Sequence, residues 1–134
     1  AATEAVVDGV NVTFAPMVDL ARDARWGRVM ETSGEDPYLN SLIAKATVEG
    51  FKKGGIATCV KHFAAYGGAE AGRDYNTVEL SEHVLREFYL PAYKACIDAG
   101  VDMLMPSFNT LNGLPSVANE WLMQQILKEI YGIK

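Results

Sequence analysis

The sequence contains few cysteines and histidines, no long apolar run and no block of basic residues. Its 134 residues include two cysteines, two histidines and 12 Lys or Arg against 17 Asp or Glu, for a net charge of -5. Nucleic acids and anionic membranes attract basic surfaces, so we expect neither as a partner. No apolar run approaches the roughly 20 residues that a membrane-spanning helix needs. We expect no targeting segment within these residues, and the composition leaves the cellular compartment open.

The same scarcity argues against a disulfide and against a metal site. Cys59 and Cys96 stand in apolar segments, where a free cysteine behaves as a small buried apolar residue. Two thiols and two histidines give no recognisable zinc spacing. His83 falls on the polar face of a helical stretch, which weakens any metal site built from it and His62. We therefore expect no metal ion.

A pattern of helix, glycine and apolar strand repeats along the chain. Helices are predicted over 1–8, 36–54, 80–99 and 119–132, and strands over 10–16, 56–60 and 101–105. Gly9, Gly55 and Gly100 each stand between a helix and the next strand, and Pro91 is expected to split or kink the third helix. The pattern starts again at Gly132-Ile133.

The second helix has the clearest start signal. Asp36 can accept hydrogen bonds from the first free amides, and Pro37 suits the first helical position. Four residues at helical spacing are expected to form its buried stripe: Leu39, Ile43, Ala46 and Gly50.

Strands that alternate with helices predict a parallel sheet with right-handed crossovers. Three such strands fit part of an open doubly wound sheet or part of a (β/α)₈ barrel. The predicted loops, 17–36, 61–78 and 106–118, are longer than ordinary connections, as functional loops are, and favour the barrel. A full barrel takes about 250 residues, so the predicted fold is α/β, a partial (β/α)₈ TIM-type barrel of about three βα units with parallel strands.

Polar residues follow the strand predicted over 56–60. Lys61 and His62 come directly after it, before a Gly-rich loop. The carboxyl ends of parallel strands meet on one face, so Arg28 and the segment Met105-Pro106-Ser107-Phe108-Asn109 should converge with them on one rim. Arg and Lys only donate hydrogen bonds, Asn and His do both, and aromatic rings offer a flat apolar face. Such a rim suits a neutral polyol or an oxyanion.

Simpler and competing explanations exist for the same residues. A lysine can extend from a strand end beside a structural histidine. Lys61 could instead form a Schiff base, as class I aldolases do on barrels, if desolvation kept its amine uncharged. The Gly-rich segment 66–72 lacks the Gly-Lys-Ser/Thr ending of a phosphate-binding loop, so its glycines are expected to serve turn geometry.

Five blocks that occur in a fixed order give a more specific pattern. They are Ala15-Pro16-Met17-Val18-Asp19-Leu20, Asp23-Ala24-Arg25-Trp26-Gly27-Arg28, Gly34-Glu35-Asp36-Pro37-Tyr38-Leu39, Lys61-His62-Phe63, and Ser107-Phe108-Asn109 with Asn112-Gly113. Together they resemble the N-terminal barrel domain of glycoside hydrolase family 3, the β-glucosidase and β-xylosidase family. The resemblance covers essentially the whole chain. It implies that residues 1–134 are part of the N-terminal (β/α)₈ domain of a longer polypeptide.

The resemblance implies roles for five residues. Arg28, Lys61 and His62 match family residues that hydrogen-bond hydroxyls of the glycosyl ring in the −1 subsite. Met105 and Phe108 match positions that line that pocket. Many family members have Tyr where Phe108 stands, so one hydroxyl donor is missing here.

The loop after Lys-His-Phe favours one branch of the family. The N-acetylglucosaminidase branch carries a His-containing acid/base motif in that loop, whereas segment 64–76 contains no histidine. The glucosidase/xylosidase branch is therefore favoured.

The catalytic pair implied by the resemblance is expected outside this chain. Retaining hydrolysis needs two carboxylates about 5–5.5 Å apart. The family nucleophile, an Asp, is expected at the end of the next strand, just after Lys134, and the acid/base Glu in a C-terminal α/β sandwich domain. Asp19, Glu31 and Glu35 match neither role, so we expect no catalytic residue in this chain.

The implied function is that of a retaining exo-β-glucosidase, which releases terminal non-reducing β-linked glucose without a metal or an organic cofactor. Its partners would be a β-glucoside or oligosaccharide substrate and the remainder of the polypeptide. Three alternatives stand beside it: a β-xylosidase of the same family, a non-catalytic sugar-binding module, and a Schiff-base lyase acting through Lys61.

Overall fold

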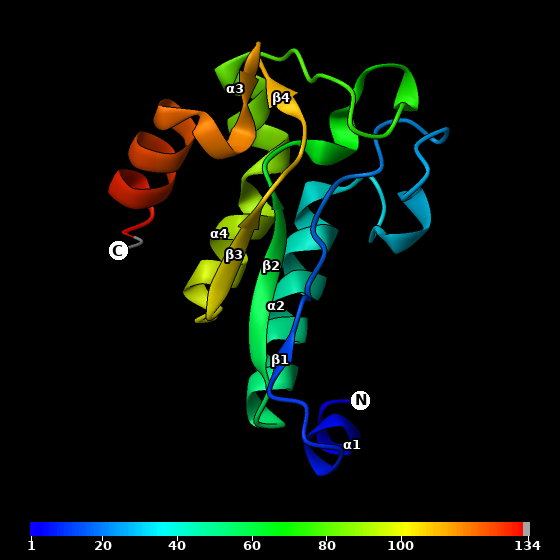
Figure 1. The fold of residues 1–134 in the computed structure, drawn as a ribbon, viewed down its shortest axis with the longest axis vertical. Helices are drawn as coiled ribbons and strands as arrows, with labels where there is room; N and C mark the ends of the chain where they lie inside the picture. Colours follow the sequence, from blue (N-terminus) through cyan, green and yellow to red (C-terminus); the bar gives the residue numbers. More distant parts are fainter. Residues whose placement is uncertain (133–134) are drawn as a thin grey trace.

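Three parallel strands form the centre of the structure. A computed structural model describes residues 1–132, and its sheet has the order β1 (Val12–Thr13), β2 (Ala57–Phe63), β3 (Met103–Pro106). Both neighbouring pairs are parallel, and the three arrows run in the same direction in Figure 1. The predicted α/β class with parallel strands is confirmed.

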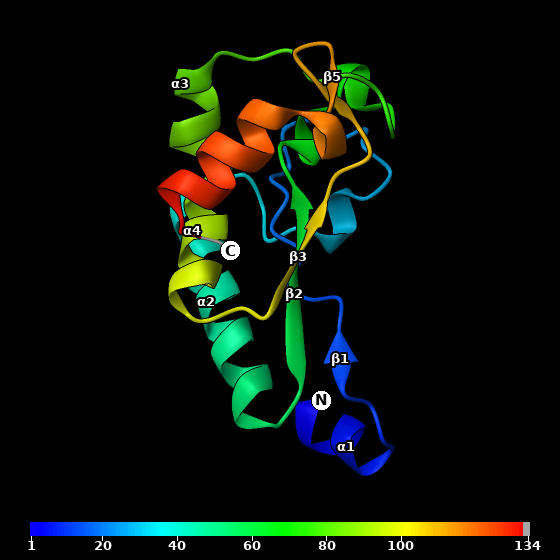
Figure 2. The same cartoon turned by 60° about the vertical axis from the view of Figure 1, so that its left-hand side comes forward.

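Helices precede and separate the strands. They are α1 (Ala2–Val7), α2 (Pro37–Lys53), α3 (Glu82–Val84) and α4 (Pro91–Asp98), with π-helical segments at Leu85–Tyr89 and Trp121–Ile130. Short 3₁₀ turns occur at Val29–Glu31, Tyr66–Gly68, Glu70–Gly72 and Ser116–Ala118. α2 and α4 pack against each other and lie on the same side of the strands in Figure 2. Within residues 1–132, none of the helices is long and apolar enough to cross a membrane.

The start of α2 agrees with the sequence prediction, but its buried face does not. Asp36 accepts hydrogen bonds from the amides of Tyr38 and Leu39 at 2.7 and 3.1 Å. The residues predicted to be buried are exposed: Leu39, Ile43, Ala46 and Gly50. The buried residues are instead Asn40, Ala44 and Val48.

The side chains on the buried face explain this difference. Ala44 and Val48 are compact members of the hydrophobic core, where α2 packs against α4 and β2. Asn40 Nδ2 donates to the carbonyl of Val18 at 2.7 Å, so α2 is also tied to the loop after β1. A prediction based on apolar content alone therefore assigned the buried face of α2 to the wrong one of two adjacent faces.

β2 is longer than predicted. The sequence predicts a strand that ends at Val60, but β2 continues through Lys61 to Phe63. Hydrogen bonds from neighbouring loops hold this extension, because the amide of Val18 donates to the carbonyl of Lys61 and that of Ser107 to the carbonyl of Phe63. β1, by contrast, occupies only two of the seven residues predicted over 10–16.

The segment 106–118, predicted as a loop, contains a β-hairpin. β4 (Thr110–Leu111) and β5 (Leu114–Pro115) pair antiparallel around Asn112-Gly113. Both turn residues have positive φ, 51° and 81°, as a tight hairpin turn requires. Asn-Gly is itself a hairpin signal, which the prediction of a loop over 106–118 did not use.

Two further helix boundaries agree with the prediction. Pro91 begins α4 after the π-helical segment Leu85–Tyr89. Asn119 Oδ1 accepts a hydrogen bond from the amide of Leu122 at 3.1 Å, as expected of a residue that begins a helix. The strand predicted to start at Gly132-Ile133 lies outside the described residues from Ile133 onward.

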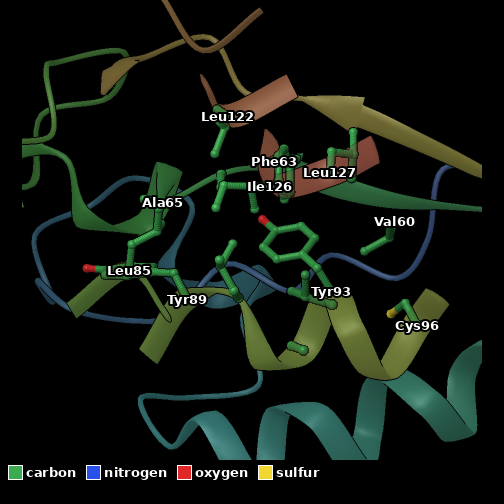
Figure 3. Packing of buried hydrophobic residues seen from close by; sticks show 14 of the residues in the cluster. Val60, Phe63, Ala65, Leu85, Tyr89, Tyr93, Cys96, Leu122, Ile126 and Leu127 are labelled. Atoms are coloured by element: carbon green, nitrogen blue, oxygen red, sulfur yellow. The ribbon is translucent and has the colours of Figure 1, made fainter. Parts of the chain in front are cut away.

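The hydrophobic core packs around Tyr93 of α4. Figure 3 shows its ring among side chains from β2 and from the Trp121–Ile130 segment. Tyr93 is 1% exposed and meets Phe63 edge to face, with 5.1 Å between the ring centroids. Cys59 and Cys96 are both buried and free, as predicted. This core fixes the carboxyl end of β2.

Gly67→Ala tests the close approach of two loops beside that strand end. A Cβ at Gly67 would lie 2.1 Å from the carbonyl oxygen of Leu20, and rotating a side chain cannot relieve a backbone clash. We expect the substitution to lower the free energy of unfolding by about 3 kcal/mol, measured by chemical denaturation followed by circular dichroism. Gly50→Ala is the matched control, because nothing lies within 4 Å of its added Cβ. Equal stability of the two variants would contradict the observed packing.

Candidate functional site

Four of the five predicted site residues come together where the strands end. The loops that follow β1, β2 and β3 gather at the same end of the sheet, at the top of Figure 1. Arg28 from the first loop reaches His62 in β2, with 3.2 Å between Nη1 and Nε2. Lys61 is the partner of Met105 in the β2–β3 register. The predicted convergence of Arg28, Lys61, His62 and Met105 is therefore observed.

His62 is held by a buried carboxylate, Asp19, to which the sequence prediction assigns no role. The two residues are each 2% exposed. His62 Nδ1 lies 2.7 Å from Asp19 Oδ2, and the His62 amide donates to the same oxygen at 3.3 Å. Burial raises the pKa of Asp19, while the hydrogen bonds from His62 act in the opposite direction. The imidazole is thus fixed from the inside of the protein.

Arg28 is also held by Glu31 and by the ring of Tyr66. Its Nε and Nη2 donate to the two carboxylate oxygens of Glu31 at 2.7 and 2.8 Å, a bidentate pair. This pair raises the pKa of Arg28 and lowers that of Glu31. The guanidinium carbon also lies 5.8 Å from the centre of the Tyr66 ring. The orientation of the guanidinium plane is therefore set before any ligand binds.

Lys61 differs from Arg28, because no side chain in the described part of the chain binds its amine. Among residues 1–132, the ion pairs do not include Lys61, and it forms no side-chain hydrogen bond. It is half-buried, and its charge contributes to the lowered pKa of Glu31. Its peptide bond to His62 is cis. A half-buried cation with three free N–H groups is available to a ligand.

The fifth predicted residue, Phe108, adds an apolar wall. It is 64% exposed. Its ring centroid lies 6.5 Å from that of His62, 6.3 Å from that of Tyr66 and 5.4 Å from that of Tyr75. An exposed aromatic face therefore stands directly beside the polar groups.

A second set of residues, which sequence reasoning missed, supports Arg28. The Trp26 indole donates to Asp74 Oδ1 at 3.1 Å, and the Tyr66 hydroxyl donates to the same oxygen. The rings of Trp26 and Tyr66 meet edge to face at 5.1 Å. Burial alone would raise the pKa of Asp74, but the hydrogen bonds from Tyr66 and Trp26 lower it overall. No local spacing predicts this contact, because 48 residues separate Trp26 from Asp74.

Asn109 does not belong to the rim, contrary to the prediction. It is 0% exposed, and its Nδ2 donates to the carbonyl of Thr110 at 3.1 Å. Its own carbonyl accepts from the amide and the hydroxyl of Ser116. Asn109 therefore holds the hairpin that follows β3 and is buried away from the exposed rim.

The chemistry available at this site is hydrogen-bond donation to a polar ring. Each carboxylate close to it already accepts from protein donors: Asp19 from His62, Glu31 from Arg28, and Asp74 from Tyr66. The free groups are a cation and an exposed aromatic face. This combination binds a hydroxyl-rich ligand, since the donors meet its oxygens and the ring meets its C–H groups. Within residues 1–132, no cluster of three or more His, Cys, Asp or Glu side chains is arranged to hold a metal.

Comparison with known families gives a match over the whole chain. The model described as "Glycosyl hydrolase family 3 N terminal domain" matches residues 1–134. A periplasmic beta-glucosidase of Salmonella typhimurium is 45% identical, over 99% of this chain and 18% of the relative. A beta-xylosidase of Formosa agariphila is 38% identical, over 98% of this chain and 20% of the relative. The chain thus spans about a fifth of the length of these curated relatives.

Solved structures agree with this match. A mutant (D270A) beta-glucosidase from Listeria innocua, crystallised with laminaribiose, superposes with a TM-score of 0.96 at 50% identity. The superposition covers 98% of this chain and 20% of that protein. The same enzyme has also been crystallised with glucose. The fold described above is therefore part of a family 3 N-terminal domain, in agreement with the partial barrel predicted from the sequence.

Asp74→Ala tests the support beneath Arg28. Without the carboxylate, the Trp26 indole and the Tyr66 hydroxyl lose their acceptor, so we expect about 1–2 kcal/mol less stability at pH 7. Because the folded-state pKa of Asp74 is lowered, its charged form stabilises the fold fully above its unfolded value near pH 4 and loses this effect as the pH falls through the folded-state value.

Denaturation of wild type and variant at a series of pH values measures both expectations. The stability difference should shrink below about pH 4. Asp98→Ala is the control, because Asp98 is exposed on α4 and pairs with the exposed Lys94. A loss at Asp74 no larger than that at Asp98 would show that the buried donors do not depend on this carboxylate.

Proposed function

Because this chain belongs to glycosyl hydrolase family 3 and matches its N-terminal domain model in full, we propose that it supplies the sugar-binding wall of a retaining exo-β-glucosidase. The enzyme removes terminal non-reducing β-linked glucose from a β-glucoside or an oligosaccharide. The observation that carries the proposal is the convergence of Arg28, Lys61 and His62. Relatives named beta-glucosidase, at 45% and 50% identity, support it.

The chemistry of the polar groups suits the hydroxyls of a glucose ring. Lys61 has no protein partner among residues 1–132, so its N–H groups are free to donate to hydroxyl oxygens. The imidazole of His62 and the guanidinium of Arg28 lie beside it in fixed orientations. Phe108 presents an apolar face, and Met105 lies next to Lys61 in the sheet. These five residues are the proposed substrate-binding residues of the chain.

Rigid donors contribute to catalysis by positioning the sugar. In retaining hydrolysis, one carboxylate attacks the anomeric carbon and a second protonates the leaving oxygen. Groups that hold the ring hydroxyls in place keep the anomeric carbon in line for this attack, and fixed donors do not have to reorganise during it. Arg28 meets this requirement, because Glu31 and His62 fix its guanidinium and leave one N–H on Nη1 and one on Nη2 free to donate.

The catalytic pair is proposed to come from outside residues 1–134. The carboxylates beside the site are unsuited to the chemistry, because protein donors already occupy Asp19, Glu31 and Asp74. We assign the nucleophile to an Asp on the strand that follows, and the acid/base to a Glu in a C-terminal α/β sandwich domain. No residue of the present chain is assigned a catalytic role.

Exposed apolar side chains support the presence of further barrel units. β1 and β3 are the edges of the sheet, and Val12 and Met103 on them are 43% and 38% exposed. On α2, Leu39, Leu42 and Ile43 are also exposed. A closed barrel pairs such edges and covers such faces. The remainder of the polypeptide is the proposed cover.

A β-xylosidase is the second candidate, because a relative of that name is 38% identical over 98% of this chain. Xylose lacks the hydroxymethyl group of glucose, so the two sugars place the same demands on donors to the ring hydroxyls. The ratio of kcat/KM for aryl β-glucoside and aryl β-xyloside decides between the two.

The decisive variant for this function is Lys61→Met, made in the full-length protein that contains this chain. Methionine keeps the length and apolar character of the side chain but removes its donors. Loss of a charged hydrogen bond to a sugar hydroxyl is expected to lower kcat/KM for an aryl β-glucoside by roughly 10- to 100-fold. Lys53→Met is the control, because Lys53 is exposed at the far end of α2. Unchanged activity in Lys61→Met would contradict the proposed binding site.

The remaining alternatives have their own readouts. A Schiff-base lyase would be trapped on Lys61 by borohydride in the presence of a carbonyl substrate, whereas the glycosidase is expected to give no adduct. A sugar-binding module would bind glucose in the full-length protein without hydrolysing any aryl β-glycoside. Residues 1–134 expressed alone are expected to show no turnover, and activity in a clean sample would place the nucleophile among the carboxylates of this chain.

A further inference from the structure

We propose that Asp19 is a positioning residue, which sets the orientation and tautomer of His62 and, through it, the place of the Arg28 guanidinium. Nothing in the sequence pattern assigned Asp19 this role. The inference rests on the proposed function, because its consequence for a substrate follows only if Arg28 binds one.

The burial of Asp19 is the first observation. Its side chain is 0% exposed, and it lies in the loop after β1, beneath the end of β2. Burying a carboxylate away from water costs free energy unless charged or hydrogen-bonding partners replace the lost hydration. An apolar residue of similar size would avoid this cost. The presence of a carboxylate at this buried position is therefore explained by the groups that it binds.

The hydrogen bonds of Asp19 converge on one residue. Oδ2 lies 2.7 Å from His62 Nδ1 and accepts from the His62 amide at 3.3 Å. Tyr93 also lies within reach, with its hydroxyl 3.4 Å from Asp19 Oδ1 and 2.6 Å from the carbonyl oxygen of His62. A phenol has only one proton, and the shorter contact takes it. Asp19 and Tyr93 therefore bind the side chain, the amide and the carbonyl of His62 between them.

The neighbours on either side of the imidazole select one tautomer. Arg28 Nη1 lies 3.2 Å from His62 Nε2, and a guanidinium can only donate. Nε2 must therefore offer its lone pair, which leaves the proton on Nδ1, where Asp19 accepts it. A proton on Nε2 would point at the N–H of Arg28. The contacts thus agree on a neutral imidazole with Nδ1–H.

This tautomer completes the anchoring of Arg28. Glu31 binds Nε and Nη2 of the guanidinium, and His62 accepts from Nη1. If the imidazole turned or changed tautomer, Arg28 would lose the contact that ties it to β2. Asp19 therefore acts on the sugar-binding surface without touching the sugar, in the way that a carboxylate behind a metal-bound histidine fixes the ring it supports.

The tautomer can be read directly in the full-length protein. Nitrogen-15 NMR of protein labelled at histidine distinguishes Nδ1–H from Nε2–H, and His62→Gln identifies the signal of His62. We expect a neutral ring with its proton on Nδ1. A proton on Nε2, or a doubly protonated ring at neutral pH, would overturn the proposal. This readout needs no activity, so it stands even if no glycoside is hydrolysed.

A kinetic double-mutant cycle tests whether Asp19 acts through His62. Asp19→Asn keeps the shape of the side chain but weakens the acceptor, and we expect kcat/KM for an aryl β-glucoside to fall roughly 10- to 100-fold. In the His62→Ala background the same change should cost less than about twofold, because the residue through which it acts is gone. Full multiplication of the two effects would show an independent structural role and overturn the proposal.

Asp98→Asn is the matched control for the loss of charge. Asp98 is exposed on α4 and pairs with Lys94, so its kcat/KM should equal that of wild type. Thermal denaturation of each variant separates a loss of positioning from a loss of fold. If the wild-type protein hydrolyses no aryl β-glycoside, the proposed function is contradicted. The NMR result would still decide whether Asp19 sets the tautomer of His62.

Discussion

The hydrogen bond between Asp19 and His62 is the contact on which the rest of the site depends. Both side chains are buried, and each would carry a large desolvation cost without the other. The bond joins the loop after β1 to the end of β2, and Gly67 allows the next loop to approach the carbonyl of Leu20. The strand end is therefore rigid on its own. Arg28 takes its position from this rigid end, through its contact with Nε2 of His62.

The polar groups around the strand ends fall into two sets with different tasks. In the first set, protein donors already bind each carboxylate: Asp19, Glu31 and Asp74. These groups hold the scaffold in place. In the second set, Lys61 has no partner within residues 1–132, and the ring of Phe108 faces solvent. This division explains why the site is suited to binding a hydroxyl-rich ring and why the attacking and protonating carboxylates are proposed to come from elsewhere.

Local signals in the sequence predicted much of the fold. Asp36, Pro91 and Asn119 mark helix boundaries because each acts on its own backbone neighbours. The sequence prediction was wrong or incomplete where the structure depends on long-range contacts. The buried face of α2 depends on what packs against it, as the bond from Asn40 to the loop after β1 shows. The role of Asp19 depends on a residue 43 positions away, and no spacing rule encodes that distance.

The most direct test of the central claim is a crystal structure of the full-length protein with glucose bound. If the rim binds the sugar, ring hydroxyls should lie within hydrogen-bond distance of Lys61 and of the Arg28 guanidinium, with Phe108 against the ring. Arg28 should still contact His62 when the sugar is present. A glucose molecule bound elsewhere, with Lys61 in contact with water or protein alone, would contradict the claim that this rim is the sugar site.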